Sequence, residues 1–329
     1  MLTIQIYSPA ELSARVREVL QDDPLVSALA VSTGASVIPP GDVIVADVPR
    51  EAANAIIERL DATGVAIAGT IHISPTASWV SRPALSAEQA APGDPADAVV
   101  WAQTVQDSYR QTGLSWSYLS FMLMATLMAS IAIILDSSIL VIGAMVLGPE
   151  FGAVAALGVA LVTRRFGLLR RAIVAIVAGF AIAIVVATLI VLLGRAAGFV
   201  DPAVVTAPRP GTSFIYEPGG WSILIALIAG AAGVLAMTSE RTGGLVGVFI
   251  SVTTIPAAGN IALAVACWAP AQVLGSSAQL VINLTGLALA GWVTLLLQRR
   301  VWAWVPGIAP LRGVGAKSDP RRGRRARSK

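Results

Sequence analysis

The chain has 329 residues, of which 56% are hydrophobic and only 13% are charged, and its mean hydropathy is +0.76. Soluble domains carry roughly 25% charged residues, so this composition excludes an ordinary soluble protein. The single cysteine, Cys267, excludes an internal disulfide, and the single histidine, His72, disfavours a histidine-built metal site or a Ser-His-Asp triad. We therefore predict an integral membrane protein with no metal and no cofactor, and an enzyme is the weakest reading.

Residues 1–74 are predicted to form an α+β domain of order βαββαβ, the ferredoxin-like pattern. The expected elements are a strand "LTIQIY", a helix with Ser8 as N-cap and Pro9 at its first position, strands "PLVSALAV" and "DVIVADV", a helix capped by Gly64, and a strand "VAIAGTIHI". His72 falls on the polar face of that last strand. The loop "STGASVIPPG" is interpreted as a hairpin-like connection rather than a ligand loop. Such a domain binds a small ligand or pairs subunits, and the fold alone does not choose.

Residues 75–95 are rich in Pro, Ala and Ser and are interpreted as a linker. Residues 96–114 are predicted to form an amphipathic connecting helix, which packs on the membrane domain through Val99, Ala102, Val105 and Tyr109. The membrane domain covers residues 115–298, and residues 299–329 form a basic tail.

The membrane domain is predicted to contain about six transmembrane helices. Arginines at 164, 165, 170 and 171 lie between the second and third spans, and the tail is strongly basic, so both termini are expected in the cytoplasm. The long loop 195–220, which carries Arg195 and Arg209, is expected outside. The predicted spans are 116–135, 138–163, 172–194, 221–238, 244–268 and 278–298.

The second and fifth spans share a Pro-x-x-G spacing, formed by Pro149 with Gly152 and by Pro256 with Gly259. Each of these spans is the second in a group of three, and three is odd, so the two groups cross the membrane in opposite senses. This pattern predicts two inverted three-helix repeats. Paired interruptions by proline and glycine are typical of a transporter binding site, although ordinary helix kinks are the alternative.

Glu150 follows Pro149 near the middle of an apolar segment. A charge at the bilayer centre costs at least about 2.5–3.5 kcal/mol, so such residues usually face a cavity or a partner. We expect Glu150 to be protonated, to bind a cation, or to accept a hydrogen bond from Asn260, Asn283 or Thr285. The candidate substrate or ion site therefore comprises Pro149, Glu150, Gly152, Pro256, Gly259, Asn260, Asn283 and Thr285.

The segments "LVIGAMVLGPEFGAV", "LIAGAAGVLAM", "LVGVFISVTTIPAAGNIALAVA" and "LVINLTGLALAGWVTLLL" resemble successive motifs of the bacterial membrane proteins grouped as domain-of-unknown-function family 389. The resemblance covers most of residues 115–298. Many relatives have an apolar residue where Glu150 stands, and many have two prolines where Ile255 and Pro256 stand. The family implies the architecture and a bacterial inner-membrane protein, and it names no substrate.

Two functions stay open. The first is a secondary transporter or channel-like protein for a small solute or ion, with the α+β domain as a regulator. The alternative is a membrane-anchored sensor whose α+β domain binds a small ligand without transport. The expected partners are the lipid bilayer and a small solute or ion, without nucleic acid. Small-residue faces permit a homo-oligomer, and the expected location is the cell membrane with multiple passes.

Overall fold

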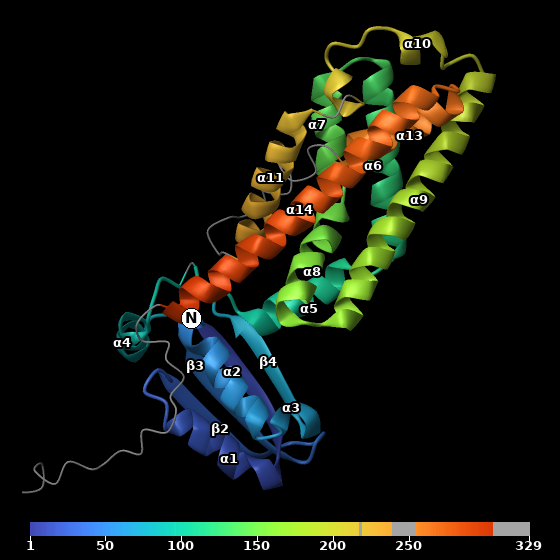
Figure 1. The fold of residues 1–329 in the computed structure, drawn as a ribbon. Coiled ribbons are helices and arrows are strands. Elements are labelled where there is room, and N and C mark those ends of the chain that lie inside the picture. The colour runs from blue at the N-terminus through green and yellow to red at the C-terminus, as the bar shows by residue number, and fades with distance from the viewer. Residues whose placement is uncertain (96, 217–218, 239–253, 305–329) are drawn as a thin grey trace, which may run out of the picture.

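The computed structural model describes residues 1–95, 97–216, 219–238 and 254–304. An α+β domain adjoins one end of an elongated bundle of helices (Figure 1). The α+β domain consists of β1 (Leu2–Pro9), α1 (Ala10–Gln21), β2 (Ala28–Ser36), β3 (Gly41–Val48), the 3-10 turn η1 (Arg50–Ala52), α2 (Ala53–Ala62), α3 (Val65–Ala68) and β4 (Thr70–Pro75).

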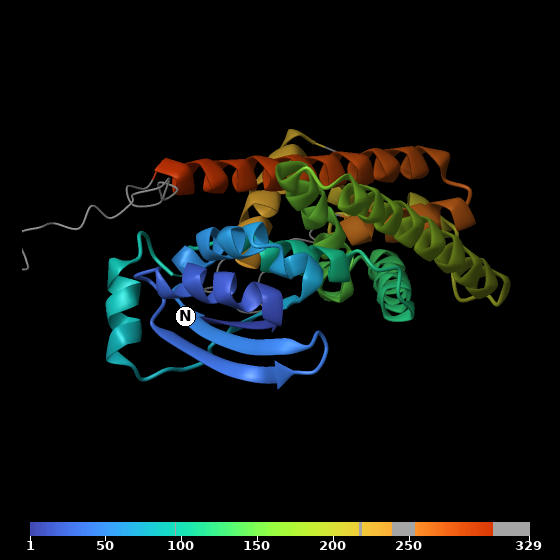
Figure 2. The ribbon, with the colours of Figure 1, turned by 90° about the horizontal axis from the view of Figure 1, so that it is seen from below.

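The four strands form one antiparallel sheet in the order β2-β3-β1-β4. Side chains of β1 alternate strictly between buried and half-buried positions, because successive residues of a strand point to opposite faces. Helices α1 and α2 cover one face (Figure 2). The other face is partly exposed and carries His72, as predicted, with its ring edge-on to Tyr7 at 5.4 Å between centroids.

Three local predictions in this domain were wrong. The second strand covers Ala28–Ser36 and not residues 24–31, so the connection to β3 is only residues 37–40. Residues 65–68 form the short helix α3 and not the start of a strand, since Thr70 of β4 pairs with Tyr7 and β1 ends at Pro9. A strand that began at Val65 would have no partner to pair with. Ser8 does not cap α1 but lies buried in β1, which extends to Pro9, and Pro9 takes the N-cap position. Gly64 does follow α2 with a left-handed φ of 85°, the conformation that suits the end of a helix.

The segment between the two domains is more ordered than a linker. It contains α4 (Arg82–Ala90), capped by the Ser81 hydroxyl, which accepts from the Ala84 amide at 3.2 Å. The connecting helix α5 (Trp101–Gln111) is shorter than predicted. It packs on the bundle as expected, with Val105 in a cluster with residues of α8 and α14.

The bundle consists of α6 (Trp116–Ile134), α7 (Ser138–Leu147), α8 (Glu150–Thr163), α9 (Phe166–Ala196), α10 (Ala203–Thr206), the 3-10 turn η2 (Ser213–Ile215), α11 (Gly220–Thr238), α13 (Thr254–Ala266) and α14 (Pro270–Trp304). The end that adjoins the α+β domain is called the near end, and the end that carries α10 and η2 is called the far end (Figure 1). Helix α14 runs from the far end to the near end.

Within the described residues, the helices α6, α9, α11 and α14 are long and apolar enough to cross a membrane, and the bent pair α7–α8 would make a fifth span. The first four predicted spans match α6, α7–α8, α9 and α11. Helix α13 has 13 residues, fewer than the roughly 20 that a span requires. The first half of the predicted fifth span falls within 239–253, outside the described residues, so six spans remain a prediction.

Candidate functional site

The second predicted span is broken where the sequence places Pro149. Helices α7 and α8 meet at an angle of 56° across Gly148 and Pro149. Proline cannot donate a backbone hydrogen bond, so a helix that reaches it from the N-terminal side ends there. Glu150 is therefore the first residue of α8, and its side chain is only 1% exposed. The partial positive charge at a helix N-terminus favours a carboxylate at this position.

A second helix, α13, contacts the same place. The Thr254 hydroxyl, in the first residue of α13, donates to Glu150 Oε1 at 2.6 Å, and both side chains are buried. Beside this pair the backbone of Gly148 faces Ile255, whose Cγ1 would lie 2.7 Å from a Cβ added to the glycine. The N-terminus of α8 and the first described residue of α13 thus meet inside the bundle at one carboxylate. The partner shown by the structure is Thr254, which the sequence analysis did not name.

The other half of the Pro-x-x-G pattern behaves differently from the first. Pro256 is the third residue of α13, in the first turn, where its missing amide costs little. Gly259 lets α13 approach α6, because its carbonyl accepts from the Ser130 hydroxyl at 3.0 Å and an added Cβ would meet Ala129 Cβ at 2.6 Å. Gly152 in α8 similarly gives space to the Gln111 side chain of α5. Both glycines therefore serve close packing, and neither is needed to explain the break.

Asn260 belongs to a buried polar cluster nearer the far end. Its Nδ2 donates to Ser276 Oγ at 2.7 Å and to Gln272 Oε1 at 3.3 Å. Arg209 enters this cluster from the long loop between α9 and α11, and donates to Asn260 Oδ1 at 3.4 Å and to Gln272 Oε1 at 2.5 Å. The guanidinium stacks over the Tyr216 ring at 4.8 Å. Arg209 is only 3% exposed, although the sequence marked it merely as one charge in an external loop.

The same loop closes the far end. Its apolar side chains Val205 and Ile215 are buried among residues of α6, α7 and α13. Thr212 donates its hydroxyl to Asp136 Oδ1 at 2.8 Å, which ties the loop to the turn between α6 and α7. With Arg209 in place above Asn260, the polar cluster is covered at this end.

A line of polar residues, half-buried at Gln272 and buried at the other three positions, follows one face of α14. Gln272, Ser276, Gln279 and Asn283 recur at the spacing i, i+4, i+7 and i+11, which puts them on one side of a helix. Gln279 Nε2 donates to Asn283 Oδ1 at 3.5 Å, while Gln279 Oε1 and Asn283 Nδ2 have no hydrogen-bond partner among the described residues. This spacing is present in the sequence, where it indicates a polar face on the last helix, but we did not predict that face.

The polar line reaches the level of Glu150. Helices α13 and α14 run in opposite directions, and Asn260 contacts Ser276. Six residues back along α13 lead to Thr254, and seven residues onward along α14 lead to Asn283, so both lie about 10 Å from that contact. Helical geometry thus puts Asn283 at about the level of Thr254 and Glu150, while Asn260 lies about 10 Å nearer the far end.

Thr285 stands apart from this interior. It is exposed on the outer side of α14, where it lines a groove of about 390 Å³ with Leu157, Ile173 and other apolar residues. The structure thus separates Thr285 from the remaining candidates. Among the described residues no group of three or more His, Cys, Asp and Glu could hold a metal ion.

Long apolar helices around a buried polar interior are consistent with a multi-pass membrane protein. Residues 145–289 match the family model described as Domain of unknown function (DUF389), so the chain carries a domain of that family. All eight candidate residues lie within the matched segment. No curated protein and no solved structure matches the chain.

Proposed function

We propose that this protein is a secondary transporter, or a channel-like protein, for a small solute or ion. The observation that carries the proposal is the break before α8, where the buried Glu150 carboxylate at the helix N-terminus accepts a hydrogen bond from Thr254 of α13 inside the bundle. Broken helices at mid-depth are the usual way in which a membrane protein offers helix ends and carbonyls to a solute. The polar line along α14 supports a route between this point and the far end.

In this proposal the bundle contains six spans in two inverted three-helix repeats. The first group is α6, α7–α8 and α9, and the second ends with α13 and α14. Support comes from the shared Pro-x-x-G spacing of Pro149 with Gly152 and of Pro256 with Gly259, and from the hydrogen bond between Thr254 of α13 and Glu150 of α8. The arginines around Arg165 favour a cytoplasmic near end with both chain termini on that side.

Glu150 is proposed to take up a proton or to coordinate a cation during transport. The Thr254 hydroxyl donates a hydrogen bond to Glu150 when the solute is absent. The loop that carries Arg209 covers the far end, so opening on that side would require this loop to leave the Asn260 cluster.

The α+β domain is proposed to be ferredoxin-like and regulatory. Its strand order β2-β3-β1-β4, with two helices on one face, supports this assignment. The alternative function, a membrane sensor that does not transport, rests on the contact between this domain and the segment that leads into α5, where Asn54 donates to the Val99 carbonyl at 2.6 Å.

Flux measurements in proteoliposomes test the proposal. Glu150→Gln keeps the size of the side chain and removes its titration, so we expect normal insertion and loss of proton- or cation-dependent solute movement. Glu58→Gln, an exposed residue of α2, is the matched control and should leave flux unchanged. Unchanged ion dependence in Glu150→Gln would remove the carboxylate from the mechanism. If the wild-type protein moves none of the solutes and ions tested, the sensor function takes precedence.

A further inference from the structure

A small cavity lies at the joint between the two domains. It has a volume of about 90 Å³ and is lined by Glu51 of η1, by Asn54 and Ala55 of α2, by Ala98, Val99 and Trp101, and by Gln298 and Arg299 at the near end of α14. Asn54 holds the joint together, because it donates to the Val99 carbonyl at 2.6 Å and accepts from the Trp101 amide at 3.0 Å. The cavity is therefore part of the contact between the domains.

Glu51 brings a buried carboxylate to this cavity. The residue is only 7% exposed, and neither carboxylate oxygen accepts a hydrogen bond from another described residue. Taking a carboxylate out of water without a compensating partner is costly, so such a group usually serves a bound cation or a donor. Glu51 is thus a buried polar side chain that lines an enclosed space and has no partner there.

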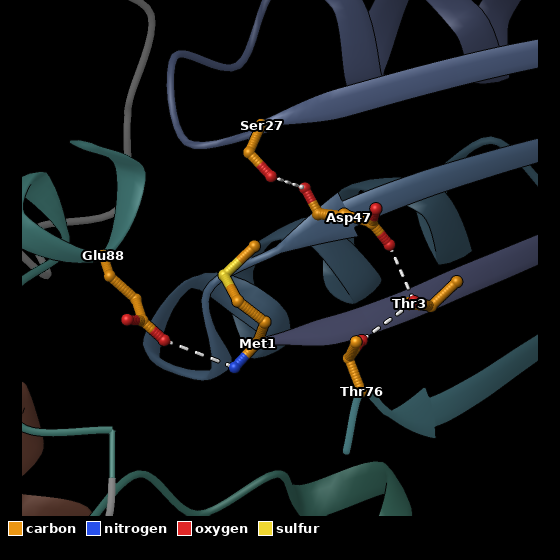
Figure 3. Close-up of polar contacts among 6 residues, drawn as sticks. All are labelled: Met1, Thr3, Ser27, Asp47, Thr76 and Glu88. Atoms are coloured by element: carbon orange, nitrogen blue, oxygen red, sulfur yellow. Dashed lines mark hydrogen bonds and ion pairs between the residues drawn. The ribbon is translucent and has the colours of Figure 1, made fainter. Parts of the chain in front are cut away.

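The cations around Glu51 are engaged elsewhere. The Met1 amino group lies 3.4 Å from Glu88 Oε1 (Figure 3), Arg50 Nε donates to the Ala98 carbonyl at 2.8 Å, and Arg299 donates to the Val162 carbonyl at 3.0 Å. Burial raises the pKa of the Glu51 carboxyl, and the charges of Glu88 and Asp94 act in the same direction, against its own backbone amide and the Met1 amino group. A bound cation would offset the free-energy cost of burying the charged Glu51 carboxylate.

We propose that the cavity binds a small cation that carries N–H donors, namely a primary ammonium or a guanidinium group. Its charge would pair with Glu51, and the indole of Trp101, which also lines the cavity, would favour a cation further. The volume admits the charged group with few carbon atoms. Two sources have this chemistry: a free small amine, and a lysine or arginine side chain from residues 305–329, the basic segment that follows α14 in the sequence.

The position of the cavity gives this site a regulatory role. Trp101 begins α5, which packs against α8, and Arg299 donates to the carbonyl of Val162 in the last turn of α8. Both elements that line the cavity on the bundle side thus contact the helix that begins with Glu150. A ligand at the joint acts on α8 whether or not the bundle transports a solute.

The test uses the full-length protein in detergent and its thermal unfolding midpoint at a fixed scan rate. The probe is methylammonium chloride, compared with sodium chloride and with tetramethylammonium chloride, which lacks N–H donors. We expect methylammonium alone to raise the midpoint of the wild type and of Glu58→Gln by about 2 °C or more. Glu51→Gln should show no such rise. Its elution volume in size-exclusion chromatography should equal that of the wild type, which shows that the variant is folded.

A second full-length variant separates the two sources. In it, every lysine and arginine of residues 305–329 is replaced by glutamine. A methylammonium response in this variant but not in the wild type shows that the chain supplies the cation itself, and a response in both shows that the site takes a free amine. The proposal is overturned if Glu51→Gln shows the methylammonium rise, if tetramethylammonium gives the same rise, or if neither the wild type nor the second variant responds. None of these outcomes depends on transport, so the site and the transport function fail separately.

Discussion

The two domains each bury a carboxylate near the start of a helix, and they treat it differently. In the bundle, Glu150 begins α8 and accepts a short hydrogen bond from Thr254, the first residue of another helix. In the α+β domain, Glu51 lies in the turn before α2, and neither oxygen accepts from another described residue. In the bundle, Thr254 donates a hydrogen bond to the Glu150 carboxylate, whereas at the joint no other described residue donates one to Glu51.

The presence or absence of a hydrogen-bond partner decides whether a buried carboxylate stabilises the fold or destabilises it until a ligand binds. A carboxylate with a hydrogen-bonding partner contributes to the fold around it, so removing the partner should destabilise the protein. A carboxylate without one is a cost to the fold, so neutralising it should stabilise the protein. The two sites therefore predict effects of opposite sign.

The largest effect is expected at Thr254. Thr254→Val keeps the shape of the side chain and removes the hydroxyl, so Glu150 loses a hydrogen bond to a charged group, worth about 1.5–3 kcal/mol. We expect a lower midpoint of thermal unfolding in detergent. Thr254→Ser keeps the hydroxyl and should remain close to the wild type. In a Glu150→Gln background the cost of Thr254→Val should shrink, and an equal cost in both backgrounds would show that the pair is not coupled.

A smaller effect of opposite sign is expected at Glu51. Because burial raises the pKa of this carboxyl in the folded state, the folded protein binds its proton more tightly than the unfolded chain does. The associated stability is present below the unfolded pKa and is lost as the pH rises through the folded pKa. Glu51→Gln should therefore have a higher midpoint than the wild type at pH 7, by a margin that narrows as the pH falls toward 4.5.

This measurement is made without added amines, with Glu58→Gln as the control for the loss of a surface charge. A lower midpoint for Glu51→Gln at pH 7 would mean that the carboxylate is supported after all, and the contrast between the two domains would disappear.

The smallest effect is expected at Thr285, the candidate that the structure separates from the others. Thr285→Val changes an exposed side chain on the outer face of α14, so unfolding stability should change by less than about 0.5 kcal/mol. Flux should match the wild type in any assay in which Glu150→Gln is impaired. A loss of flux in Thr285→Val comparable with that in Glu150→Gln would extend the site to the groove on the outer face.

Sequence patterns predicted the α+β domain more fully than the bundle. In β1 the apolar residues Leu2, Ile4 and Ile6 are buried on one face, as their alternation predicts, because water lies on the other side. In the bundle, apolar side chains such as Val177 and Leu193 are exposed on the outside of α9 while Ala175 and Ala183 are buried. Both faces of such a helix are apolar, so hydrophobic periodicity does not show which one turns inward.

The sequence by itself determined that helices must break at Pro149, that Glu150 is costly in an apolar segment, and that glycines would let helices approach closely, because these follow from covalent geometry and from the energy of burying charge. Only the tertiary structure decided which residue meets Glu150, that Arg209 turns into the far end, that Thr285 faces outward, and that Glu51 lines a cavity at the joint. Thr254 and Glu150 are 104 positions apart in the sequence, and Arg209 and Asn260 are 51 positions apart. Local propensity carries no information about such pairs, since helix packing alone brings them together.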